Sequence, residues 1–152
     1  MSNRSILLSL LLVTGMSTTF AQTTTRQSAF PPVGLGSGET AEVNIINVAS
    51  NSSAGTAASC AGNITFTNAA GTTVGAVTPF TLASGQALTA RLPFASLAIA
   101  GTRGVVRALI NETIPTATPR PPCSLEFSFQ TFDTATGATH SLLTGAARIS
   151  GR

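Results

Sequence analysis

Hydrophobic and polar residues alternate most clearly in the stretch PPCSLEFSFQTFD, residues 121–133. After two prolines, every second residue is apolar: Cys123, Leu125, Phe127 and Phe129. The residues between them are polar. A period of two is typical of a strand with one buried and one solvent-facing side. The pattern therefore predicts a strand here, with a cysteine at its first buried position.

Further segments have strand character and are separated by turn signals such as AAG (69–71) and SGQ (84–86): residues 40–50, 60–68, 72–82, 87–94, 104–112 and 139–145. Pro79 interrupts one of them, which favours an edge position because proline cannot donate to a strand ladder. Residues 95–101 are expected to form one helical turn. The residues predicted to face inward are Cys60, Ile64, Phe66, Leu88, Ala90, Leu92, Val106, Ala108 and Ile110. Short strands at this spacing predict an all-β fold, a two-sheet antiparallel sandwich of about seven strands.

The first residues have the pattern of a secretory signal. Arg4 precedes an apolar run over residues 6–13, and small and polar residues follow. This order predicts a signal peptide over residues 1–21, cleaved after Ala21. The run is shorter than the ~18 apolar residues that a membrane span requires, so no transmembrane span is predicted.

Residues 22–39 contain few core candidates and much Thr, Gly and Pro. They are predicted to form a flexible, exposed lead that ends in a turn at Ser37–Gly38, ahead of a sandwich domain over residues 40–152. Phe30 meets two prolines and nothing upstream alternates, so the lead is expected to be a poor donor for strand exchange.

The chain has two cysteines, Cys60 and Cys123, and both fall on inward positions of predicted strands. An exported chain meets oxidising surroundings, in which two cysteines without a third competitor are expected to pair. We therefore predict one disulfide between the two sheets rather than a reactive thiol.

If the strands are lettered A to G, Cys60 lies on strand B and Cys123 on strand F. This layout resembles that of immunoglobulin-like domains, whose B and F strands carry an inter-sheet disulfide. The chain differs from antibody-type domains in having no Trp and no Tyr. Its strand starts LGSGE and LASGQ and its FD…TG hairpin are also similar to small secreted bacterial sandwich proteins of unknown function. Both resemblances imply a fold, and neither implies an activity.

Charge argues against a nucleic-acid partner. The formal net charge is +3 and the pI is about 10.2, but all the basic residues are arginines spread along the sequence. A nucleic-acid interface needs a concentrated basic patch, so we predict no nucleic-acid binding.

Candidate catalytic residues are few. Asp133, His140 and Ser141 supply the residue types of a catalytic triad, but they lie in one predicted hairpin, whereas a triad needs three side chains that converge on a pocket. We expect a surface hairpin with a turn at residues 133–137, and no catalytic residue. A zinc site needs several ligands, so neither a metal site nor a cofactor is predicted. GLGSG, residues 34–38, lacks the spacing of a phosphate-binding loop and is interpreted as a flexible linker.

Acidic and asparagine residues add two smaller expectations. Glu42, Glu112 and Glu126 are expected on strand surfaces, where they can pair with Arg91 or Arg107. The N-glycosylation triplets, which we interpret as chance matches, begin at Asn51, Asn63 and Asn111.

The sequence thus predicts a secreted, non-catalytic structural or interaction module of matrix, surface or adhesive type, with a protein or surface polymer as its partner. The alternative is an extracellular ligand-binding domain for a glycan or peptide. The predicted location of the protein is the periplasm, the cell surface or the medium. The last strand has no proline and little charge, so self-association through its edge is a further expectation.

Overall fold

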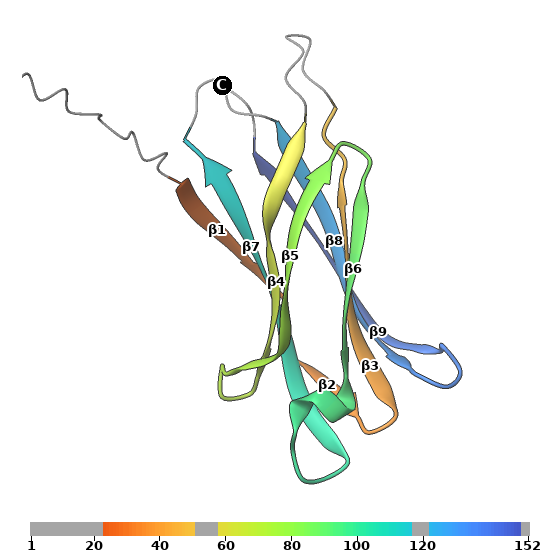
Figure 1. Cartoon of the computed structure of the whole chain (residues 1–152). Coiled ribbons are helices and arrows are strands. Elements are labelled where there is room, and N and C mark those ends of the chain that lie inside the picture. Colours follow the sequence, from red (N-terminus) through yellow and green to blue (C-terminus); the bar gives the residue numbers. More distant parts are fainter. Residues whose placement is uncertain (1–22, 51–57, 117–121, 150–152) are drawn as a thin grey trace, which may run out of the picture.

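The computed structural model describes residues 23–50, 58–116 and 122–149, which form two antiparallel sheets packed face to face (Figure 1). The five-stranded sheet consists of β1 (Thr23–Ala29), β2 (Val33–Gly36), β7 (Arg103–Pro115), β4 (Ser59–Asn68) and β5 (Thr73–Ala83). The four-stranded sheet consists of β6 (Ala87–Pro93), β3 (Glu39–Asn47), β8 (Cys123–Asp133) and β9 (Thr139–Ile149). The predicted all-β sandwich is confirmed, and the predicted strands correspond to β3 through β9.

Strand β8 lies between β3 and β9, inside the four-stranded sheet. Its apolar residues Cys123, Leu125, Phe127 and Phe129 are buried, and Glu126 between them is exposed. The period of two therefore predicted the correct face, because a paired strand presents alternate side chains to opposite sides of its sheet.

The other predicted inward residues also face the space between the sheets. All are buried except Leu88, which is half-buried and packs against the core. Strand β5, which contains Pro79, pairs only with β4 and is an edge strand, as expected. The predicted helical turn is a 3-10 helix over Phe94–Leu97, which starts and ends earlier than expected; Ala98, with a φ of 50°, follows it.

The prediction of a flexible lead over residues 22–39 is wrong. Strands β1 and β2 both pair with β7 and extend the five-stranded sheet by one edge. The sandwich therefore begins at residue 23 among the described residues. GLGSG is likewise not a linker, because residues 34–36 belong to β2; only the turn at Ser37–Gly38 is as predicted.

Most β1 side chains are polar and exposed, which is typical of an edge strand with a solvent-facing side and gives no core pattern in the sequence. Its apolar anchor, Phe30, follows the strand and is buried. The Phe30 ring lies 5.4 Å from that of Phe127 and 5.4 Å from that of Phe129, between centroids. It thereby closes the core on the side of β8.

Strand β9 is longer than predicted. It pairs with β8 from Thr139 to Ile149, four residues beyond the expected end at residue 145. Small residues at its end gave no strand signal, but the β8 ladder provides partners for their backbone groups.

Candidate functional site

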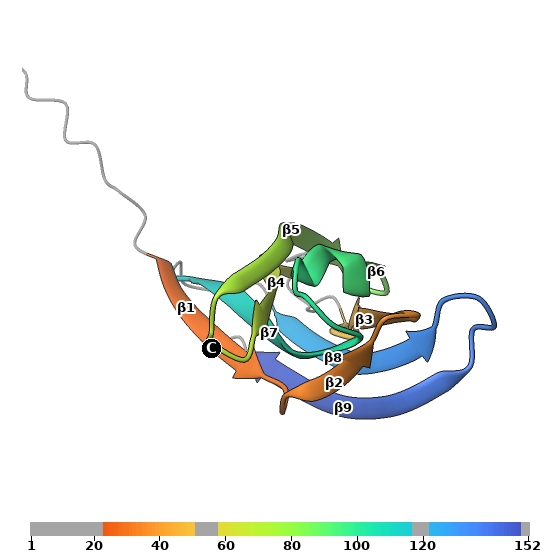
Figure 2. The same cartoon turned by 90° about the horizontal axis from the view of Figure 1, so that it is seen from below.

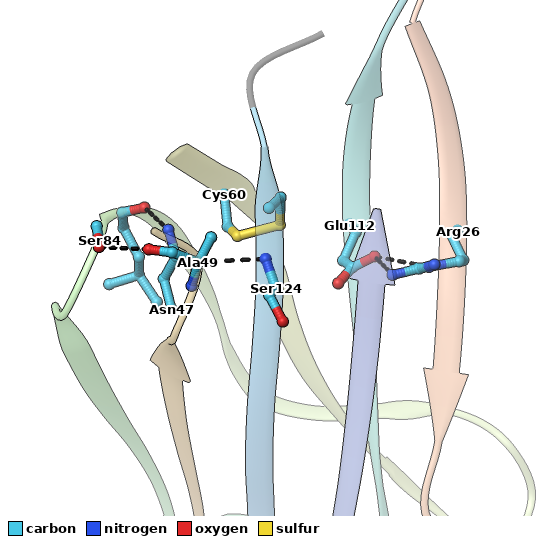
Figure 3. The surroundings of a disulfide bond; sticks show 9 residues. Arg26, Asn47, Ala49, Cys60, Ser84, Glu112 and Ser124 are labelled. Carbon is cyan, nitrogen blue, oxygen red and sulfur yellow. Dashed lines mark hydrogen bonds and ion pairs between the residues drawn. A yellow bond between two sulfur atoms is a disulfide. The ribbon is translucent and has the colours of Figure 1, made fainter. Parts of the chain in front are cut away.

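The two cysteines form the predicted disulfide. Cys60 of β4 and Cys123 of β8 join the five-stranded to the four-stranded sheet, with their Cα atoms 5.1 Å apart (Figure 3). Both are buried. The bridge is therefore structural: a thiol chemistry would need an accessible sulfur.

A buried asparagine beside the disulfide was not predicted. The Asn47 amide donates to the Leu82 carbonyl at 2.9 Å, and its oxygen accepts from the Ala49 N–H at 3.0 Å (Figure 3). The Ser124 N–H also approaches this oxygen, at 3.4 Å. These bonds satisfy the buried amide and hold the end of β3 against β8, which makes Asn47 a structural residue.

A second polar group at this end of the sandwich is the Arg26–Glu112 ion pair (Figure 3). Arg26 Nε lies 2.7 Å from Glu112 Oε2, and Nη2 lies 2.5 Å from the same oxygen. The Glu112 side chain is 2% exposed and that of Arg26 35%. The expectation that Glu112 lies on a strand surface is therefore wrong. Its position in phase with the inward residues Ala108 and Ile110 was the signal that could have revealed this.

The triad candidates do not converge. Asp133 Oδ1 accepts from the backbone N–H groups of Ala135 and Thr136, at 3.0 and 2.7 Å, and so caps the predicted turn. His140 Nδ1 bonds to Glu39 Oε1 instead. The Ser141 hydroxyl lies 2.8 Å from that of Thr131. Each candidate thus has its own partner, and no nucleophile–base–acid chain is formed.

His140 and Ser141 do line a small polar pocket of about 360 Å³ between β2 and the β8–β9 hairpin. Figure 2 shows the strands at this end of the sandwich. Glu39 and Arg103 line it as well. The Arg103 guanidinium covers Gly34 closely, since a Cβ at Gly34 would lie 2.7 Å from Nη2. The pocket thus contains one acid, one arginine, one imidazole and hydroxyl groups.

Hydrogen bonds stabilise the carboxylate forms of three acids. The Gly36 N–H donates to Glu39 at 2.6 Å, and with His140 and Arg103 it lowers the pKa of Glu39 despite partial burial. Burial alone would raise the pKa of Glu42, but bonds from Asn44, Arg91 and Gln130 outweigh it and lower that pKa. The pKa of Asp133 is lowered by Thr136 and Ala135. The Glu42–Arg91 pair, at 2.6 Å, is one of the predicted pairings. The prediction that Glu42 lies on a strand surface is wrong, because the residue is 6% exposed.

These shifts predict acid sensitivity. A carboxyl group whose folded-state pKa lies below its unfolded value of about 4 stabilises the fold above that value, and the contribution is lost as the pH falls through the folded pKa. We expect the urea midpoint to fall between pH 5 and pH 3, and to fall less in Glu42→Gln than in the exposed matched variant Glu126→Gln. An unchanged or higher midpoint at pH 3 would contradict the prediction.

The asparagine triplets have different positions. Asn63 and Asn111 face outward from the five-stranded sheet and join Gln27 in an amide ladder: Gln27 Nε2 donates to Asn111 at 2.8 Å, and Asn111 Nδ2 donates to Asn63 at 3.0 Å. Asn51 lies outside the described residues. That these triplets are chance matches stays a prediction.

Within residues 23–50, 58–116 and 122–149, no three His, Cys, Asp or Glu side chains are grouped so that they could hold a metal ion. In the same part of the chain, no helix is long and apolar enough to cross a membrane. The predicted signal peptide lies outside it.

Comparison of the chain with protein-family models, with curated proteins and with solved structures finds no match. The immunoglobulin-like relationship therefore stays a prediction, and function is inferred from the chain's own features.

Proposed function

We propose that the chain is an exported, non-catalytic structural or interaction module of matrix, surface or adhesive type. The disulfide supports an oxidising destination, since such bonds persist mainly outside the reducing cytoplasm. The separate partners of Asp133, His140 and Ser141 argue against a hydrolase of the triad type. The observation that carries the proposal is the unprotected edge of β9.

The edge strands of the described sandwich differ in how they are protected against pairing. The β1–β2 edge is interrupted by Pro31 and Pro32, and β5 contains Pro79 and a register shift opposite Ile64 and Phe66. Strand β6 ends at Pro93 and joins β5 through a tight turn. Prolines and bulges are the usual means of preventing edge-to-edge contact.

Strand β9 has no such protection beyond its first residues, where its ladder with β8 has a register shift between Ser141 and Thr139. It is 11 residues long and contains no proline, and residues 141–147 carry no charge. Leu142 points outward and is 59% exposed. A strand of this kind can accept a partner strand through backbone hydrogen bonds, either from another protein or from a second copy of this chain.

Light scattering on the purified protein over a range of concentrations tests self-association through β9. In a symmetric antiparallel pair centred near Gly145, Thr144→Lys places two like charges close together, so we expect association to weaken about tenfold. Thr81→Lys is the matched control, because Thr81 is an exposed threonine on the other sheet. Leu143 is unsuitable for substitution, since it packs against the core. Equal association of both variants would exclude β9 as the contact.

A ligand-binding domain for a glycan or peptide is the second candidate. The pocket that contains Arg103, Glu39, His140 and Ser141 favours it, because a few convergent polar groups are typical of ligand sites. Glycan and peptide arrays probed with the wild type and with Arg103→Ala test this candidate. A ligand retained by the wild type and lost by the variant would favour it over the structural module.

A further inference from the structure

Strand β1 is attached to the sandwich through one neighbour. Its residues pair with β7 in an unbroken antiparallel register from Thr23 opposite Pro115 to Ala29 opposite Leu109. Among the described strands β1 pairs with no other. Five of its seven side chains are exposed, and only Arg26 and Ser28 are half-buried. Few side-chain contacts therefore retain this strand.

Two contacts give the β1 site its specificity. Arg26 reaches the buried Glu112 carboxylate, and Phe30 fills the space beside Phe127 and Phe129. Without β1, Glu112 would be a buried carboxylate without this arginine, which is a costly arrangement. The edge of β7 is thus best paired by a strand that contains a cation and, four residues further along that strand, an aromatic ring. The segment TTTRQSAF supplies both.

The junction between β1 and β2 separates the two strands. Ala29 lies opposite Leu109 and Val33 opposite Val106, so the lead contains one more residue than β7 over this interval. Pro31 and Pro32 occupy the bulge and have no N–H to donate. They also keep the preceding backbone extended, which allows β1 to leave β7 without disturbing β2.

We propose that β1 is an exchangeable strand, and that the β7 edge of one copy accepts residues 23–30 of a second copy. This proposal reverses the sequence-based expectation of a poor donor, because the segment forms a regular ladder with β7 and buries Phe30. Each copy donates its strand to the other, so the exchanged dimer contains the same Arg26–Glu112 and Phe30 contacts as the monomer. The monomer has the advantage of a high local strand concentration, so exchange becomes important as protein concentration rises. This contact lies on the sheet opposite β9 and does not depend on the β9 edge.

Charge reversal across the pair provides the test. The variants Arg26→Glu and Glu112→Arg each contain a like-charged pair, both within one chain and between identical chains. In their mixture, exchange restores two opposite-charge pairs per dimer. We expect native mass spectrometry to show heterodimer at more than about ten times the dimer level of either variant alone. The double variant Arg26→Glu/Glu112→Arg, which restores the pair within one chain, is the matched control.

A milder pair of variants covers the case in which an arginine at position 112 prevents folding. Gln27 and Asn111 are cross-strand partners on the outer face, with side chains 2.8 Å apart. After incubation at high concentration and oxidation, Gln27→Cys mixed with Asn111→Cys is expected to give at least about five times more covalent heterodimer than Gln27→Cys mixed with Thr81→Cys. Equal yields in the two mixtures would overturn the proposal.

The β9 contact is separated from exchange by adding Thr144→Lys to both partners. Heterodimer that survives this change supports exchange through β1. Heterodimer that disappears with it assigns the contact to β9 and overturns the proposal, while leaving the interaction-module function in place. If exchange fails and β9 pairing is observed, the proposed function likewise stands.

Discussion

Replacement of both Cys60 and Cys123 by alanine is expected to lower the free energy of unfolding by about 4 kcal/mol. The disulfide joins residues 63 positions apart and links the two sheets. Cross-linking so long a segment removes many conformations from the unfolded chain, and the loss of entropy grows with the logarithm of loop length. A domain of this size has a total stability of about 5–15 kcal/mol, so the bridge contributes a large part of it.

Urea unfolding of the wild type and the double alanine variant, followed by circular dichroism, measures this difference. The m-value should rise in the variant, because its unfolded chain is less compact. A reducing agent should destabilise the wild type and leave the variant unchanged, which serves as the control. A loss below about 1 kcal/mol would show that the sheets are held together almost entirely by packing.

The fold could be predicted wherever a strand has one apolar and one polar side. Strand β8 is the clearest case, and its alternation identified both the buried face and the position of Cys123. Strands β4 and β7 follow the same rule through Ile64, Phe66 and Ile110. In each case the buried face lies against the opposite sheet, so the sequence pattern directly reflects the packing.

Strand β1 could not be predicted, because its pattern does not depend on the core. It is an edge strand whose backbone pairs with β7 while most of its side chains meet solvent. Backbone pairing alone does not impose a pattern of apolar and polar residues on the sequence. In addition, the two prolines after Phe30 indicated a loop. The end of β9 was missed for the same reason, since its small residues are ordered by the β8 ladder.

The polar clusters depend on contacts that sequence distance conceals. Glu39 and His140 are 101 residues apart, and Arg26 and Glu112 are 86 apart. Nothing local to either residue indicates its partner, because the pairing follows from strand order and register. Glu112 is an exception in one respect, because the alternation along β7 already places it on the inward face. A buried acid on a core face implies a cation opposite it.

Phe30→Ala is expected to lower the free energy of unfolding by about 3–4 kcal/mol. The side chain is 6% exposed, and its ring contacts two further phenylalanines, so truncation leaves a cavity in the aromatic part of the core. A flexible lead would make this substitution harmless. The experiment therefore tests directly whether residues 23–36 belong to the folded domain.

Phe132→Ala is the matched control for that experiment. Phe132 is a half-buried phenylalanine on the outer face of the four-stranded sheet, where the Arg91 guanidinium carbon lies 5.9 Å from its ring centroid. A partly solvated contact of this kind contributes less to stability, so we expect Phe132→Ala to lower the free energy of unfolding by about 1 kcal/mol. Urea midpoints with equal m-values make the two variants comparable. If Phe30→Ala lowers the free energy of unfolding by no more than Phe132→Ala does, Phe30 does not stabilise the core. The strand that precedes it is then held only by its ladder with β7.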